Sequence, residues 1–224
     1  MSTVNGSTAG TPGPGPARSA ESPGVVIGNH TNKYVTKNPA IRFLTERWVA
    51  RLDDFLEHIG NSEAPPKRPL EVGAGEGVIS MRLYERFGDA TAIDLPDSGL
   101  RAEWKTRPGP RYLHADAEKQ PFRDDEFDLT VCVEVLEHLR DPEKGLRELA
   151  RVTSEHLLVS VPREPIFRGC NLLTGRYVKE LGNTPGHFNH WSTRSFVRFL
   201  SQVGTVRAVS KPFPWTVAWV RLGN

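Results

Sequence analysis

Three ionisable side chains close an otherwise apolar segment, VCVEVLEHL at residues 131–139. Glu134, Glu137 and His138 are spaced so that a helical turn would bring all three to one side. Two carboxylates and an imidazole can hold a divalent cation such as Mg²⁺, which would acidify a bound hydroxyl, or they can move a proton directly. In the remaining alternative, Glu137 and His138 cap the turn and pair with Arg140 or with backbone.

A second group of side chains suited to proton transfer lies in GHFNHW, residues 186–191. Imidazole titrates near neutral pH, so a histidine in a pocket can act as a general base. His138, His187 and His190 are therefore the candidate catalytic bases, and Trp191 is a candidate substrate contact. The alternative is that the histidines are hydrogen-bonded loop residues and that Trp191 anchors the core.

Two arginines lie close together in VPREPIFR, residues 161–168. A guanidinium group binds a carboxylate or a phosphate through two parallel hydrogen bonds. Arg163 and Arg168 are therefore candidates for binding an anionic group on the substrate, unless Arg163 simply neighbours Glu164 at the surface.

The segments that must position these side chains alternate between two patterns from residue 69 onward. Short runs rich in branched apolar residues predict strands at 69–74, 90–95, 111–116, 127–135 and 156–161. Helices are predicted at about 77–87, 97–105, 141–152 and 193–203. This alternation predicts right-handed crossovers and a doubly wound, mostly parallel α/β sheet. The last two apolar runs, 206–213 and 214–222, are separated only by a proline-containing break and predict an antiparallel hairpin at the sheet edge.

The N-terminal region divides into two parts. Residues 1–24 are dominated by Gly, Pro, Ser and Thr and predict a disordered tail. Residues 25–60 contain a predicted helix with Asn38 as its N-cap and Pro39 in its first turn. A proline-rich break at 61–69 then leads into the main domain, residues 69–224.

Polar or glycine-rich residues end three successive predicted strands, where open α/β sheets bind their ligands. The first strand runs into EVGAGEG, residues 71–77, and the second and third end at Asp94 and Asp116. Val78 breaks the spacing of the dinucleotide fingerprint, and the acidic Glu71 favours a cationic ligand over a pyrophosphate. Asp94 could accept hydrogen bonds from ribose hydroxyls and Asp116 from an adenine amine, unless both only cap loops.

The ordered motifs EVGAGEG, AIDL, HADAEKQPF and FDLTVCVEVLEHL resemble those of class I S-adenosylmethionine-dependent methyltransferases of the small-molecule "type 11" kind. The resemblance is strong over residues 69–162. It implies a Rossmann-like sheet of seven strands with a reversed last strand, S-adenosylmethionine as cofactor and S-adenosylhomocysteine as product.

The resemblance also implies roles by position. The residues of the glycine loop that would contact the methionine end of the cofactor are Gly73, Ala74, Gly75 and Gly77. The carboxylate of Glu71 lies just before this loop in the sequence. Asp94 would hold the ribose, Leu95 would pack on adenine, and Asp116 with Ala117 would hold the adenine edge. Glu134 would lie where cofactor and substrate meet, and Tyr34 would cover the site from a lid before the first helix.

The acceptor is harder to predict than the cofactor, because a sulfonium already carries an activated methyl group and the protein must mainly align a nucleophile with it. The histidines favour O-methylation of a small or lipid-like acceptor, and the arginines favour a phosphate or carboxylate on it. The alternatives are an RNA or protein methyltransferase, and a cofactor-binding protein or repurposed cyclase without methyl transfer. Similar E-x-x-E-H clusters bind metal in ubiquinone-biosynthesis and small-RNA O-methyltransferases, but metal-free type 11 enzymes look alike here, so we expect no metal.

Composition limits the partners and the location. Basic and acidic residues nearly balance at a formal net charge of +2 and are scattered, so we expect no nucleic-acid partner. Only two cysteines, Cys132 and Cys170, are present, too few for a disulfide framework. No apolar run reaches the roughly 18 residues of a membrane span, and no secretory signal is recognisable, so we expect a cytoplasmic protein.

Overall fold

The chain folds around one seven-stranded sheet with the strand order β3-β2-β1-β4-β5-β7-β6. The computed structural model describes residues 34, 36–175 and 177–223, so the predicted tail and most of the predicted lid lie outside the described residues. The strands are β1 (Pro69–Val72), β2 (Thr91–Asp94), β3 (Arg111–His114), β4 (Phe127–Val133), β5 (Thr153–Pro162), β6 (Thr205–Ser210) and β7 (Trp215–Arg221).

All pairings are parallel except the two made by β7, which lies between β5 and β6 and runs antiparallel to both. The doubly wound, mostly parallel sheet with a reversed last strand is therefore confirmed. The predicted terminal hairpin is also present, with β6 at the edge and the later strand, β7, one position inside it.

The helices are α1 (Pro39–Gly60), α2 (Val78–Phe87), α3 (Ser98–Lys105), α4 (Pro142–Val152), α5 (Ile166–Leu173) and α6 (Thr193–Leu200), with a short 3₁₀ turn, η1 (Leu136–His138). Five of the six were predicted from their apolar periodicity. The exception is α5, none of whose residues is buried. No helix among the described residues is long and apolar enough to cross a membrane.

Helix α1 follows the predicted rules for its start and its packing. The side-chain oxygen of Asn38 accepts hydrogen bonds from the backbone N–H of Ala40 at 3.0 Å and of Ile41 at 3.3 Å. Its buried stripe includes Trp48, whose indole N–H donates to the hydroxyl of Ser160 in β5 at 2.8 Å. This bond attaches α1 to the centre of the sheet.

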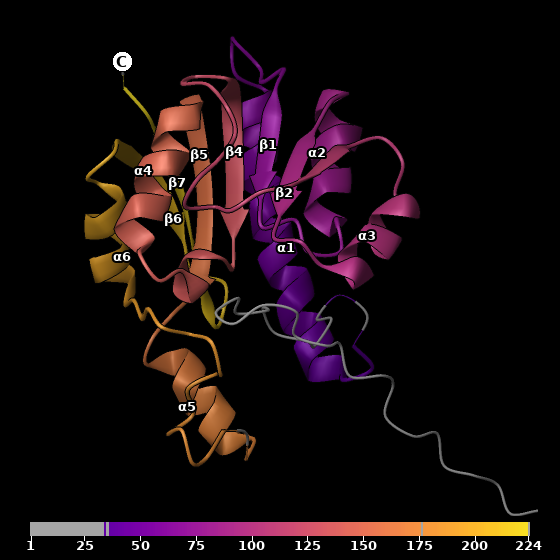
Figure 1. Ribbon diagram of the computed structural model, residues 1–224. Coiled ribbons are helices and arrows are strands. Elements are labelled where there is room, and N and C mark those ends of the chain that lie inside the picture. Colours follow the sequence, from indigo (N-terminus) through magenta and orange to yellow (C-terminus); the bar gives the residue numbers. More distant parts are fainter. Residues whose placement is uncertain (1–33, 35, 176, 224) are drawn as a thin grey trace, which may run out of the picture.

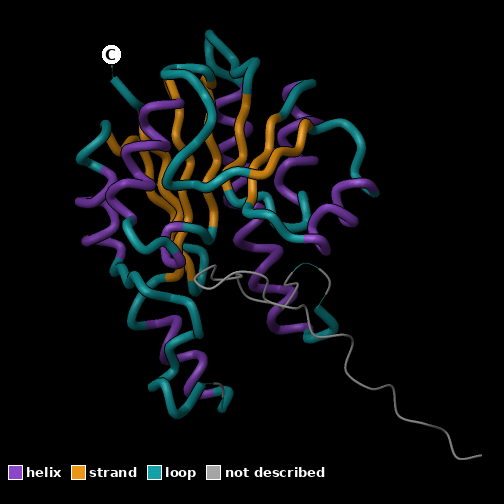
Figure 2. Tube along the Cα trace, in the orientation of Figure 1, coloured by secondary structure: helices purple, strands orange, loops and turns teal. Residues whose placement is uncertain are grey.

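Helices cover both faces of the sheet (Figure 2), and a large apolar core lies between helices and sheet on each face. Residues of α1 and α2 pack on one face, and residues of α4 and α6 pack on the other. The parallel strands point toward one end of the molecule, the lower end in Figure 1, where α5 and the first turns of α1 project beyond the sheet. Loops at that end are the ones that can form a ligand site.

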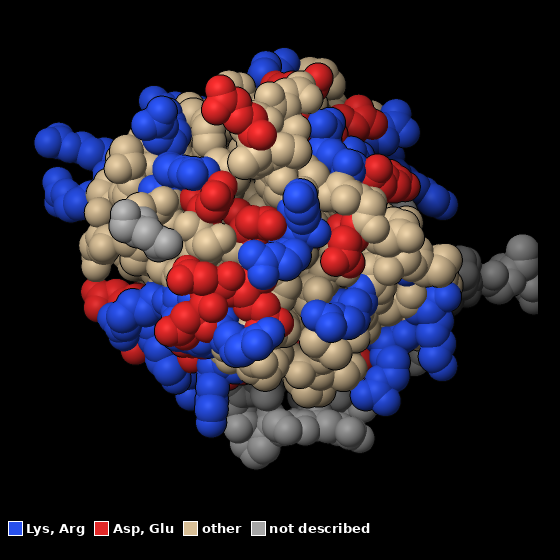
Figure 3. Space-filling model, turned by 90° about the horizontal axis from the view of Figure 1, so that it is seen from above, with Lys and Arg blue, Asp and Glu red and all other residues tan. Residues whose placement is uncertain are grey.

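The opposite end, where the parallel strands begin, has a surface of mixed charge (Figure 3). Ion pairs join neighbouring segments there, including Arg151 with Asp124 at 2.9 Å and Arg221 with Glu155 at 2.8 Å. Because acidic and basic groups alternate, this end offers no surface of a single sign.

Candidate cofactor and acceptor site

The loop between β1 and α2 has a backbone that only glycine adopts easily. Gly73, Gly75 and Gly77 all have positive φ, at 83°, 49° and 83°. A Cβ on Gly73 would lie 2.1 Å from a methyl carbon of Val135, so this position has no room for any side chain. A Cβ on Gly75 would meet no atom within 4 Å, so the loop is open on the side where a ligand would approach.

Asp94 joins the end of β2 to this loop. Its carboxylate oxygens accept hydrogen bonds from the backbone N–H of Gly75 and of Leu95, each at 2.7 Å. Burial raises the pKa of Asp94, while these two N–H donors oppose the rise. A carboxylate has about four acceptor positions, so lone pairs remain for the ribose hydroxyls that the resemblance assigns to it.

Trp104 of α3 supports the glycine loop and was not identified from the sequence. Its indole N–H donates to the carbonyl of Gly75 at 2.8 Å. Its ring stacks on Tyr112 with centroids 4.9 Å apart and also lies 4.9 Å from the ring of His114. This aromatic group fixes the loop from the side of β3, and nothing in the local pattern of α3 distinguishes such a role from ordinary core packing.

Glu71 lies fully buried beneath the loop and accepts a hydrogen bond from the hydroxyl of Ser80 in α2. Burial is the largest cause that raises the pKa of Glu71, to about 8. The side chain is therefore mainly protonated at neutral pH when no cation is near. A positively charged ligand would favour its ionised form, as expected beside the cationic methionine end of the proposed cofactor.

Glu134 leaves β4 in a strained conformation. Its φ is +59°, a value that costs a residue with a side chain about 1 kcal/mol or more. Its carboxylate accepts the indole N–H of Trp215, the first residue of β7, at 2.7 Å. Its own backbone N–H donates to the carbonyl of Ser160 at 3.0 Å. The residue predicted to meet cofactor and substrate is thus held by two neighbouring strands.

Tyr34, the predicted cover residue, lies near Trp48 and near the carboxylates of Glu71 and Glu134. Its ring centroid is 6.3 Å from that of Trp48. Burial, followed by the charges of Glu71 and Glu134, raises the pKa of Tyr34 well above its usual value. Tyr34 therefore lies near the carboxylates of Glu71 and Glu134, while its role as a cover stays a prediction.

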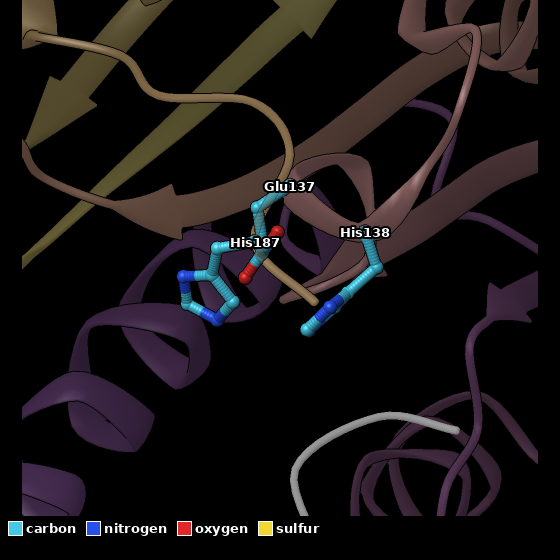
Figure 4. Close-up of side chains that lie close together, drawn as sticks. All are labelled: Glu137, His138 and His187. Atoms are coloured by element: carbon cyan, nitrogen blue, oxygen red, sulfur yellow. The ribbon is translucent and has the colours of Figure 1, made fainter. Parts of the chain in front are cut away.

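Two histidines and a glutamate from two distant segments of the chain meet close to one another (Figure 4). One potential ligand atom each from Glu137, His138 and His187 lies within 4.8 Å of the others. The rings of His138 and His187 are nearly perpendicular, with centroids 4.8 Å apart. The structure therefore groups Glu137 and His138 with His187 rather than with Glu134.

The other predicted bases and contacts lie elsewhere. His190 is exposed and bonds through Nε2 to the side-chain oxygen of Asn183 at 2.7 Å, outside the histidine group. Trp191 is buried against Phe196 and Phe199, with ring centroids 5.8 and 5.4 Å away, which is a packing role in the core.

The adenine-side prediction concerns the turn after β3. Asp116 is exposed and accepts the backbone N–H of Glu118 at 2.8 Å, so it caps that turn. Ala117 contributes its carbonyl to a hydrogen bond with the side chain of Gln120 at 3.3 Å. Asp116 therefore has the turn-capping bond of the simpler interpretation, and its remaining acceptor positions face solvent.

The two predicted arginines differ in their surroundings. The Nε of Arg163, at the end of β5, is buried and has no hydrogen-bond partner among the described residues. Arg168 of α5 donates from Nε to the carbonyl of Leu181 at 3.2 Å. Neither forms an ion pair with a carboxylate in the described part of the chain, so Arg163 in particular remains suited to an anionic group of a substrate.

The chain is similar in sequence to known methyltransferases. Residues 70–156 match the family model described as a methyltransferase domain. The chain is 36% identical over 109 residues to malonyl-[acyl-carrier protein] O-methyltransferase of Halorhodospira halophila, covering 46% of this chain and 36% of that protein. It is 30% identical over 138 residues to demethylmenaquinone methyltransferase of Renibacterium salmoninarum, covering 60% and 56%.

A solved structure shares the fold over most of the chain. Magnesium protoporphyrin IX methyltransferase from Synechocystis PCC 6803, with bound S-adenosylhomocysteine, superposes with a TM-score of 0.63 at 14% identity and covers 85% of this chain and 91% of that one. The fold and glycine loop define a Rossmann-like cofactor-binding domain. More specifically, residues 70–156 lie in a methyltransferase domain of the class I, S-adenosylmethionine-dependent kind. The matched segments cover only 36% and 56% of the two sequence relatives.

Proposed function

We propose that the protein transfers the methyl group of S-adenosylmethionine to an oxygen atom of a small organic acceptor. The observation that carries this proposal is the meeting of His138 and His187 with the buried carboxylate of Glu137, at the end of the sheet that also carries the glycine loop. A hydroxyl must lose its proton as its oxygen attacks the methyl carbon, and an imidazole at this place can take that proton.

The surroundings of these histidines favour an acceptor with an apolar or aromatic body. Ring contacts run without a break from His187 to Phe167 at 5.8 Å, from Phe167 to Trp215 at 6.4 Å and from Trp215 to Trp48 at 5.5 Å. Such a wall buries apolar surface and leaves few polar groups to satisfy. Two of the relatives, malonyl-[acyl-carrier protein] O-methyltransferase and demethylmenaquinone methyltransferase, also favour an acceptor with a long or apolar body.

Arg163 favours an anionic group on the same acceptor. Its buried Nε lies at the carboxyl end of β5, next to the segment that carries Phe167. A carboxylate or phosphate that bound there would place the rest of the molecule along the aromatic wall.

The test is transfer of a labelled methyl group from S-adenosylmethionine to a panel of phenols, quinols, carboxylic acids, RNA and peptides. We expect label on an oxygen of a small acceptor, with the product identified by mass spectrometry. Label on RNA or protein would replace this proposal with a macromolecular substrate. Tight cofactor binding without transfer to any acceptor would favour a cofactor-binding protein or a repurposed cyclase.

The histidine assignment has a matched control in the same loop. His187→Gln should lower kcat by at least tenfold for a hydroxyl acceptor because it removes a group of the buried cluster. His190→Gln alters an exposed histidine that bonds only to Asn183 among the described residues, and should leave kcat near the wild-type value. Equal losses in the two variants would contradict the assignment.

A further inference from the structure

The group formed by Glu137, His138 and His187 has the composition of a metal site. It offers two imidazole nitrogens and one carboxylate oxygen, and these three atoms all lie within 4.8 Å of one another. Bonds of about 2.1 Å to a tetrahedral ion would place such atoms roughly 3.4 Å apart. Small side-chain rotations would therefore close the group around one ion.

Backbone bonds hold the two contributing segments together independently of any ion. The carbonyl of Glu137 accepts the N–H of Phe188 at 2.8 Å and of Asn189 at 3.1 Å. The side-chain amide of Asn189 donates to the carbonyls of Leu136 at 3.0 Å and Leu139 at 2.7 Å. The loop that carries His187 is thus fixed on the 3₁₀ turn η1, which carries the other two side chains, so the group is organised in advance.

The hydrogen bonding of His138 determines which of its ring nitrogens carries the proton. Its Nδ1 lies 2.9 Å from the carbonyl oxygen of Gly186. A carbonyl only accepts, so Nδ1 carries the proton and the lone pair of the neutral ring is on Nε2. A histidine that donates one ring N–H to a backbone carbonyl and offers the other nitrogen is the usual arrangement of a metal ligand.

The burial of the donors also fits. Glu137 is 1% exposed and His187 is 6% exposed, whereas ordinary surface clusters of acidic residues are solvated. A buried carboxylate beside two imidazoles is stabilised by positive charge, which a cation supplies.

We propose that Glu137, His138 and His187 bind one divalent transition-metal ion of the zinc type, with a position left open for a further ligand. Two imidazoles and one carboxylate are the donor set of catalytic zinc sites and of related iron sites, whereas Mg²⁺ prefers oxygen donors throughout. No metal was expected from the sequence; the ligand set also differs from the alternative considered there, because His187 takes the place of Glu134.

The catalytic use of this ion, unlike its binding, rests on the proposed function. With the ion bound, His138 and His187 would act as ligands and not as bases. An acceptor hydroxyl at the open position would instead have a lowered pKa and would release its proton to water. The resulting oxygen would attack the methyl carbon, the carbon–sulfur bond would break with its electron pair on sulfur, and S-adenosylhomocysteine would leave. The ion itself would undergo no change in oxidation state.

The test is titration of the full chain, freed of metal by chelation and dialysis, with Co²⁺ and with Zn²⁺. Co²⁺ bound by nitrogen and oxygen donors at a site of low symmetry gives visible absorption, and calorimetry with Zn²⁺ gives the stoichiometry. We expect one equivalent of either ion, a Co²⁺ band that Zn²⁺ abolishes, and no displacement by Mg²⁺ at comparable concentration.

Three variants locate the ion. His138→Gln and His187→Gln should each weaken Zn²⁺ binding by at least tenfold, and circular dichroism checks that they fold. His190→Gln, in the same loop but outside the group, should bind as the wild type does. The proposal is overturned if folded wild-type protein binds neither ion, or if His190→Gln loses as much affinity as His187→Gln.

Cofactor binding in the same samples separates this proposal from the proposed function. Calorimetry with S-adenosylhomocysteine on the metal-free protein reports the glycine-loop site alone. Failure to bind S-adenosylhomocysteine would remove the methyltransferase function and leave the metal site in place. If S-adenosylhomocysteine binds but Zn²⁺ does not, the metal site is ruled out and the methyltransferase function is retained.

Discussion

Trp215 donates its indole N–H to the carboxylate of Glu134 at 2.7 Å, although the two residues are 81 positions apart in the chain. The bond joins the start of β7 to the residue that follows β4, across β5. It also connects the aromatic wall of the proposed acceptor site with the carboxylate beside the proposed cofactor site. One side chain of the reversed strand therefore positions both halves of the site.

Trp215→Phe should lower the affinity for the cofactor and should have only a small effect on the free energy of unfolding. The ring contacts with Trp48 and Phe167 would largely remain, but the donor to Glu134 would be lost, and a hydrogen bond to a charged group contributes about 1.5–3 kcal/mol. We expect affinity for S-adenosylhomocysteine to fall by about tenfold or more by calorimetry.

Trp219→Phe is the matched control on the same strand. The indole N–H of Trp219 donates to Nδ1 of His156 at 3.2 Å, on the part of β7 that lies away from the carboxyl ends of the parallel strands. This variant should lower the melting temperature by a few degrees and keep cofactor affinity. A loss of affinity in both variants would show that the effect comes from strand β7 as a whole.

Alanine substitutions at two glycines should distinguish an effect on cofactor binding from an effect of backbone strain on stability. Gly75 and Gly88 both have positive φ, at 49° and 77°, and neither would place a Cβ within 4 Å of another atom. Each substitution to Ala should therefore cost about 1 kcal/mol of unfolding free energy. Only Gly75→Ala should also weaken binding of S-adenosylhomocysteine, because only this residue lies on the cofactor loop. Equal cofactor affinities in the two variants would place the ligand elsewhere.

The carboxylate of Asp94 gives a third test. Asp94→Asn removes the charge that accepts the N–H of Gly75 and would hold the ribose, so cofactor affinity should fall about ten- to a hundredfold. Asp128→Asn is the control, because Asp128 also accepts two backbone N–H groups, from Lys67 at 3.0 Å and Arg68 at 2.9 Å, but at the opposite end of the sheet. Calorimetry should show unchanged cofactor affinity for this second variant, with only a loss of stability.

Glu71 predicts a dependence of stability on pH. Its pKa is about 8 in the folded protein, against 4.5 for a glutamate that is exposed to water, as in the unfolded chain. Between these values the folded chain keeps a proton that the unfolded chain loses, so the unfolding free energy falls as pH rises from about 4.5 to about 8. Each pKa unit corresponds to about 1.4 kcal/mol.

Urea unfolding over this pH range measures the effect. Glu71→Gln should flatten the dependence, whereas Glu85→Gln, which alters an exposed carboxylate of α2, should retain it. In the wild type, binding of the cationic cofactor should release protons near neutral pH, which calorimetry in buffers of different ionisation enthalpy detects. A slope that survives in Glu71→Gln would assign it to other groups.

Much of the fold could be predicted because it depends on local patterns. The capping of α1 by Asn38 and the alternation of strands with helices follow from residue type and spacing within short windows. Helix α5 was not predicted, although its apolar residues lie largely on one side; in the structure none of its residues is buried.

The candidate site could be predicted only where the order of the strands places its residues together. The glycine loop and Asp94 follow successive strands, so the topology alone places them together. The pairing of Glu137 with His187 and of Glu134 with Trp215 depends on how distant segments pack. His187 and His190 look equivalent in the sequence, yet burial separates them, since one is 6% exposed and the other lies at the surface.

The position of β7 has a consequence for the order in which the protein assembles during synthesis. Strand β6 leaves the ribosome first, but it joins the sheet only through β7, which must emerge next and slide in beside β5. Until then, the edge of β5 is uncovered and Trp215 is absent from its place beside Glu134. The nascent chain therefore acquires its sheet edge and the last side chain of its proposed site in the same late step.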